Sequence, residues 1–122
     1  MIQYDSIEDR KILQARGTRV VEVDAAPSFR LLLTDGLKLE YDGEVTYKLG
    51  GESIRSARPL STLPPEQVNR LVAARPLSWV VFNTGDQRIV FSNAWYLYLS
   101  VDSGQSWRLD LGDGVTLTHP PT

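Results

Sequence analysis

The chain has 122 residues, no cysteine, 42% hydrophobic residues, 23% charged residues and a formal net charge of −2. This composition is typical of one folded globular domain, and it excludes a disordered chain, disulfides, thiolate metal sites and cysteine nucleophiles. The acidic balance disfavours non-specific binding to nucleic acid or to an anionic membrane, which requires a basic surface.

The first predicted element is a helix that begins at Asp5 or Ser6, ends at Arg16 and carries Ile7, Ile12 and Leu13 as an apolar stripe. Because residues 1–6 lack the basic and apolar regions of a signal peptide, we expect a cytoplasmic protein. Four short strands then follow, near residues 18–23, 28–34, 37–41 and 45–49.

A connector rich in Gly, Ser and Pro occupies residues 50–64. A second helix is predicted from Pro64 and Pro65 to Pro76, since proline is favoured at a helix start and stops a helix further along. Four strands follow it, near residues 78–82, 88–92, 95–101 and 106–111, and a short fifth strand near 115–118. We expect the tail from His119 onward to be frayed.

The two halves of the chain repeat a series of motifs at an offset of about 58 to 60 residues. The series 30–36, 37–42 and 46–49 matches 88–94, 97–102 and 106–109. We therefore predict an α+β fold, in which a unit of one helix and about four antiparallel strands occurs twice, at about 5–50 and 64–112. The two units would pack around one core with pseudo-twofold symmetry, so that residues 1–122 form a single compact domain.

The sharpest local pattern is residues 100–107, SVDSGQSW, which fits the Asp-box S-x-D-x-G-x-[ST]-W at every defined position. It resembles the hairpin clasps of sialidase-like propellers. We predict structural roles: the Asp102 carboxylate accepts hydrogen bonds from turn amides, Gly104 forms the bend, and Trp107 packs at the start of the next strand. Asp42 begins a degenerate first copy of this pattern.

The stretch from Arg88 to Asp102 also resembles the C-terminal hairpin of small bacterial ribonucleases related to barnase. In that family a catalytic histidine follows the aspartate, whereas this chain has Ser103. Arg88 would match a phosphate-binding arginine, but the acid–base pair that cleavage requires has no counterpart. The only histidine, His119, and the acidic pairs Asp42 with Glu44 and Asp110 with Asp113 are better explained as tail and turn residues, so we predict no catalytic residue, metal or cofactor.

Alternation along the second-half strands places one group of polar and aromatic side chains on the side away from the core. Aromatic and arginine side chains of this kind are enriched at protein–protein hot spots. The alternative is that a helix or the other half of the chain covers this side. The predicted partner-binding residues are Arg88, Tyr96, Tyr98 and Arg108.

Two hairpin patterns extend over the whole chain: residues 20–24 with 31–39 in the first half, and 89–93, 97–99 and 107–109 with Pro120-Pro121 in the second. With these patterns the chain resembles a group of small bacterial proteins of immunity or accessory type. The resemblance implies a small soluble binding protein and no catalytic residues.

We therefore expect a non-enzymatic cytoplasmic protein that binds, and by binding inhibits, a protein partner such as a cognate toxin. Neither nucleic acid nor a membrane is an expected partner, and a homodimer is compatible with the sequence. One alternative is a ribonuclease-like or glycan-acting enzyme, suggested by the hairpin and the Asp-box. Another is a homo-oligomeric carbohydrate-binding or structural module.

Overall fold

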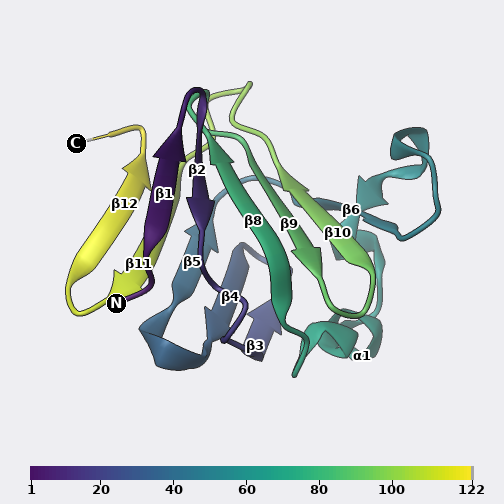
Figure 1. Ribbon diagram of the computed structural model, residues 1–122. Coiled ribbons are helices and arrows are strands. Elements are labelled where there is room, and N and C mark those ends of the chain that lie inside the picture. Colours follow the sequence, from purple (N-terminus) through teal and green to yellow (C-terminus); the bar gives the residue numbers. More distant parts are fainter. Residues whose placement is uncertain (122) are drawn as a thin grey trace.

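Strands with alternating buried and exposed side chains build two antiparallel sheets that face each other (Figure 1). The computed structural model describes residues 1–121. Along the strand Phe29–Leu33, for example, Phe29, Leu31 and Leu33 are buried, whereas Arg30 and Leu32 are half-buried on the outer side. Because each sheet has one apolar side, the two apolar sides pack together and form a single core.

The first layer is a seven-stranded sheet, which forms the front of the molecule in Figure 1. In spatial order its strands are β1 (Tyr4–Ile7), β2 (Arg10–Leu13), β8 (Pro76–Phe82), β9 (Gln87–Phe91), β10 (Trp95–Leu99), β6 (Thr46–Leu49) and β7 (Arg58–Pro59).

The second layer is a five-stranded sheet behind it. Its strands, in spatial order, are β12 (Val115–His119), β11 (Trp107–Gly112), β5 (Lys38–Tyr41), β4 (Phe29–Leu33) and β3 (Val20–Asp24).

The two halves of the chain exchange strands between the layers. The first half places β3, β4 and β5 in the five-stranded sheet and β6 in the other, where β6 pairs with β10. The second half places β8, β9 and β10 in the seven-stranded sheet and β11 in the other, where β11 pairs with β5. Each half therefore completes the sheet of the other, and the domain cannot be divided at its middle.

A short helical segment closes the lower end of the core in Figure 1. It consists of α1 (Pro65–Val68) and the 3₁₀ turn η4 (Asn69–Leu71), whose Val68 and Leu71 are buried. The remaining 3₁₀ turns are η1 (Thr34–Gly36), η2 (Ile54–Ser56) and η3 (Leu60–Thr62).

The first predicted helix is wrong, because residues 4–13 form the β1–β2 hairpin. Ile12 and Leu13 do lie against the rest of the molecule, but they do so on a strand that pairs with β8. Pairing with β8 satisfies backbone groups of β2 and extends the seven-stranded sheet. A helix as short as residues 5–16, by contrast, is only marginally stable by itself. The α+β class is therefore corrected to a mostly antiparallel β protein with one short helix.

The second predicted helix is present but much shorter than expected. It ends before Val72, which is extended, and Ala73, whose φ is +73°.

The predicted frayed tail is also wrong at His119, which belongs to β12 and lies opposite Trp107. All nine predicted strands are present, with ends within a few residues of the expected positions.

Candidate functional site

The outer side of the seven-stranded sheet carries a group of partly exposed aromatic, aliphatic and basic side chains. We call it the aromatic face and define it by Phe82, Arg88, Val90, Tyr96 and Tyr98, all half-buried. They share one side because Arg88 lies opposite Tyr98 and Val90 lies opposite Tyr96 in the β9–β10 pairing. No helix or strand of the described chain covers this face, as Figure 1 shows, so the expected alternative of a covered face is wrong.

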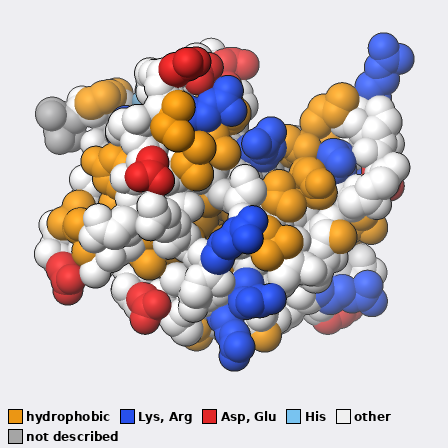
Figure 2. All heavy atoms as spheres, in the orientation of Figure 1, with side chains coloured by type: hydrophobic (Ala, Val, Ile, Leu, Met, Phe, Trp, Pro, Cys, Tyr) orange, Lys and Arg blue, Asp and Glu red, His pale blue; other side chains and the backbone are white. Residues whose placement is uncertain are grey.

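Cationic side chains lie over the aromatic rings of this face. The Lys48 ammonium is 4.0 Å from the centre of the Tyr96 ring, and the Arg10 guanidinium is 5.0 Å from the centre of the Phe82 ring. Such contacts keep the rings and the cations together on a solvent-accessible surface. Figure 2 shows these types of side chain, orange and blue, interspersed across this side of the molecule.

Arg88 is the most unusual residue of the aromatic face. Its Nε atom is buried and has no hydrogen-bond partner among residues 1–121, and Arg88 is absent from the five ion pairs of this part of the chain. Burial raises the pKa of the opposite Tyr98 hydroxyl, while the nearby Arg88 charge acts in the reverse direction. The sheet thus holds a guanidinium that lacks an anionic or carbonyl partner, next to a neutral phenol.

A groove of about 890 Å³ begins at the upper end of this face, and we call it the end groove. Phe82, Arg88 and Tyr98 line it and are shared with the aromatic face. Four carboxylates line it as well, each from a different connection between strands at the same end of the sheets: Asp9, Glu44, Asp86 and Asp102.

The structure brings together three of the four predicted partner-binding residues, Arg88, Tyr96 and Tyr98, but not Arg108. Arg108 lies on β11 in the five-stranded sheet, opposite Glu40, and its Nε is 3.2 Å from Asp110 Oδ1. The prediction of one face with all four is therefore wrong. Alternation identifies the side of a strand on which a residue lies, but it does not identify the sheet that the strand joins.

The Asp-box residues have mostly the predicted structural roles. Gly104 has a φ of +84°, which favours glycine, and Trp107 is buried with its Nε1 donating to the Gly85 carbonyl at 2.6 Å. The expectation for Asp102 is wrong, since its carboxylate accepts no hydrogen bond from residues 1–121. The turn amides have other acceptors: Asp102 N donates to Ser100 Oγ and Ser103 N to Gln105 Oε1.

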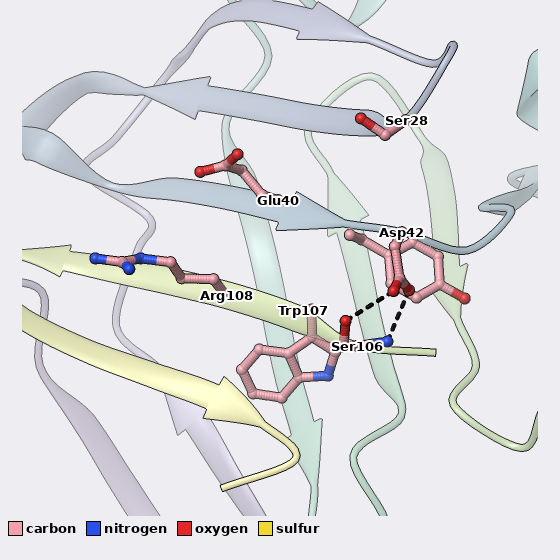
Figure 3. A pocket seen from close by; sticks show the side chains of 7 residues that line it. Ser28, Glu40, Asp42, Ser106, Trp107 and Arg108 are labelled. Atoms are coloured by element: carbon pink, nitrogen blue, oxygen red, sulfur yellow. Dashed lines mark hydrogen bonds between the residues drawn. The ribbon is translucent and has the colours of Figure 1, made fainter. Parts of the chain in front are cut away.

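Asp42, from the degenerate first copy, holds the turn instead (Figure 3). Its Oδ1 accepts from the Ser106 amide and its Oδ2 from the Ser106 hydroxyl, both at 2.7 Å. These two bonds connect the end of β5 to the start of β11 and thereby join the two halves of the chain. They lower the pKa of the Asp42 carboxyl, the backbone bond contributing most. The surrounding pocket of about 300 Å³ is small and open, so we assign this cluster a structural role.

Replacing Asp42 by alanine should lower the free energy of unfolding by about 1–2 kcal/mol at pH 7, because two hydrogen bonds to an ionised carboxylate are lost. The folded pKa of Asp42 is depressed, so this stabilisation is present above the unfolded pKa of about 3.9 and disappears as the pH falls through the folded value. Urea unfolding at pH 7 and below pH 3 would measure both effects. Asp102→Ala is the matched control, with an expected change within about 0.5 kcal/mol. Equal losses in the two variants would contradict the assignment.

The remaining sequence candidates do not form a reactive cluster. The His119 ring stacks on Trp107, with 6.1 Å between ring centres. Within residues 1–121 there is no group of three or more His, Asp or Glu side chains placed to hold a metal ion. A helix with the length and apolar character needed to span a membrane is also absent from this part of the chain.

Sequence reasoning missed the residues that turns contribute to the site. Phe82 and Asp86 flank the β8–β9 turn, and Glu44 follows the turn glycine Gly43. A signal was present, because acidic residues recur at the turn signals on one end of successive strands. Using it requires the pairing order of the strands, which the sequence does not state.

The chain matches no protein-family model, and the searches of curated proteins and of solved structures found no significant similarity either.

Proposed function

We propose that this chain is a non-enzymatic cytoplasmic binding protein that recognises a protein partner through its aromatic face. The observation that carries the proposal is an uncovered sheet surface with two tyrosines, a phenylalanine and Arg88, whose guanidinium lacks a partner within residues 1–121. Aromatic and arginine side chains are the residues that contribute most to protein interfaces, and they are scarce at the centre of an ordinary solvated surface.

The contrast between the two outer faces supports this proposal. On the five-stranded sheet, cross-strand neighbours alternate in charge: Asp24 lies opposite Arg30, Arg30 opposite Glu40, and Glu40 opposite Arg108. Such a ladder places opposite charges next to each other and is compatible with permanent solvation. The aromatic face instead exposes apolar rings and aliphatic side chains, whose burial by a partner would be favourable.

A pair of double variants tests the aromatic face. Tyr96→Ala with Arg88→Ala removes two anchors, each worth about 2 kcal/mol or more if it lies at the centre of an interface. The affinity for the partner should then fall by roughly a thousandfold, since about 1.4 kcal/mol corresponds to a factor of ten. Arg30→Ala with Arg108→Ala is the matched control on the opposite sheet, and it should bind like the wild type.

The partner is identified by photo-cross-linking in the cell that makes the protein, with the reactive group placed at Tyr96 or, as the control, at Arg108. A specific adduct from position 96 alone is the expected result. Both double variants must first give the melting transition of a folded protein. Adducts only from position 108, or equal affinity of the two double variants, would reject this face, and turnover of RNA or a glycan by the purified chain would reject the non-enzymatic assignment.

We also propose that the two halves arose from one duplicated four-stranded unit. Equivalent strand orders, with a three-stranded meander in one sheet and a fourth strand in the other, support it. The register of the two corresponding strand pairings differs. In the sequence repeat, Leu37 corresponds to Leu97 and Tyr47 corresponds to Trp107. Leu97 lies opposite Tyr47, so an exact repeat would place Trp107 opposite Leu37, but Trp107 lies opposite Tyr41. A superposition in which the fourth strands fail to overlie each other would contradict the duplication.

A further inference from the structure

The end groove combines features that a single peptide could satisfy. It is large enough for several residues of an extended peptide, and its lining includes the Phe82 and Tyr98 rings. Because Phe82, Arg88 and Tyr98 belong both to this groove and to the aromatic face, a partner bound on the face would reach the groove without a break.

The charge of the groove favours a cationic ligand. Four carboxylates and one guanidinium line it. Asp9 is paired with Arg10 at 2.9 Å, Asp86 accepts from the Val101 amide at 3.0 Å, and Glu44 accepts from the Ser61 hydroxyl at 3.1 Å, so these three are partly satisfied within the chain. Asp102 accepts no hydrogen bond from residues 1–121. Figure 2 shows acidic side chains, in red, at the upper end of the molecule, where these connections lie.

Two residues that line the groove carry buried donors without an acceptor among residues 1–121. Gln87 is 2% exposed and lines the groove. Its Oε1 accepts from Trp79 Nε1 at 2.8 Å, but its Nε2 has no partner among residues 1–121, and neither has Arg88 Nε. Buried donors without acceptors are unfavourable, and native proteins keep few of them.

We infer that the end groove binds an extended segment of the partner protein that carries a lysine or arginine side chain. The cationic side chain lies among the carboxylates of Asp102, Glu44 and Asp86 and beside the Tyr98 ring, where a cation is attracted by both charge and the ring face. A backbone carbonyl of the same segment accepts from the Arg88 guanidinium. A neutral sugar would supply hydroxyls for the donors but would leave the negative charge of the groove uncompensated.

This inference rests on the proposed function, since it names the chemistry of the segment that the partner presents. The probe is a library of labelled nonapeptides in which the central position is Arg, Lys, Gln or Glu, with binding followed by fluorescence anisotropy. Arginine and lysine at that position should be selected over glutamine and glutamate. Binding should weaken when the ionic strength rises from about 0.05 to about 0.5 M, because screening reduces the attraction between exposed charges.

Asp102→Asn should lower the affinity for the arginine peptides about three- to fivefold, as expected for one partly exposed charge pair. Asp24→Asn, which removes an exposed carboxylate on β3 of the other sheet, is the matched control and should leave the affinity unchanged. Both residues are exposed, so both variants should fold. Tyr98→Leu should also weaken binding, because the inferred contact uses the face of the ring, whereas Tyr98→Phe keeps that face and should bind like the wild type.

Selection of glutamate, lack of selection, or an unchanged affinity of Asp102→Asn would overturn the inference. Binding of a glycan array that Tyr98→Leu abolishes would assign the groove to carbohydrate and overturn it too. These outcomes are separate from a failure of the proposed function. Position 96 could cross-link to a partner whose bound segment lacks a basic residue. That result would support the aromatic face as the binding surface and reject only the assignment of the end groove.

Discussion

Each half of the chain, expressed alone as residues 1–63 or 64–122, should fail to fold. Separation removes three strand pairings at once: β2 with β8, β5 with β11, and β6 with β10. It also exposes the apolar inner side of each sheet, where Leu31 and Leu39 of one half face the core with Phe91 and Leu97 of the other. A sheet without its opposing layer cannot bury enough surface to offset the loss of chain entropy.

Circular dichroism and the dispersion of amide resonances would detect folding of each fragment, and an equimolar mixture should recover the signals of the intact chain. A matched pair of variants in the second fragment tests whether recovery depends on packing of the shared core. Leu97→Asp places a charge at a fully buried position opposite Tyr47 and should prevent recovery, whereas Tyr98→Asp, one residue further and on the outer side, should permit it. A cooperative melt of either fragment alone would disprove the interdependence of the halves.

Replacing Gly85 by alanine should destabilise the fold by about 2–4 kcal/mol, since the left-handed backbone penalises a side chain there and the surroundings leave little room for one. Gly85 has a φ of +103°, and an added Cβ would lie 2.5 Å from His119 Nδ1. The Gly85 carbonyl also accepts from Trp107 Nε1 at 2.6 Å, so a shifted turn would disturb the Asp-box tryptophan.

Urea unfolding measures this effect, with Gly17→Ala as the control. Gly17 has open space around its Cβ position and no positive φ, so the same substitution there should change stability by no more than about 1 kcal/mol. The variant Gly85→Ala with His119→Ala separates the two causes, because it removes the steric contact and leaves the backbone strain. Full recovery in that double variant would show that the backbone conformation costs little.

The local structure of this protein could be predicted from its amino-acid sequence. Alternation of apolar and polar residues predicted the strands, and it placed Arg88, Tyr96 and Tyr98 on one side because successive side chains of a strand point in opposite directions. Turn chemistry identified Gly104, and the apolar character of Trp107 predicted its burial. Each of these inferences depends only on residues that are close together in the chain.

Which strands became neighbours depended on how the whole chain packs. The exchange of β6 and β11 between sheets moved Arg108 away from Tyr96, and pairing with β8 made residues 10–13 a strand although their apolar spacing also suited a helix. The same exchange brought Asp42 to Ser106 and gathered the carboxylates of four separate connections at the end groove. Hydrophobic period specifies the buried side of a strand, whereas its neighbours follow from the packing of the whole core, to which residues far apart in the chain contribute together.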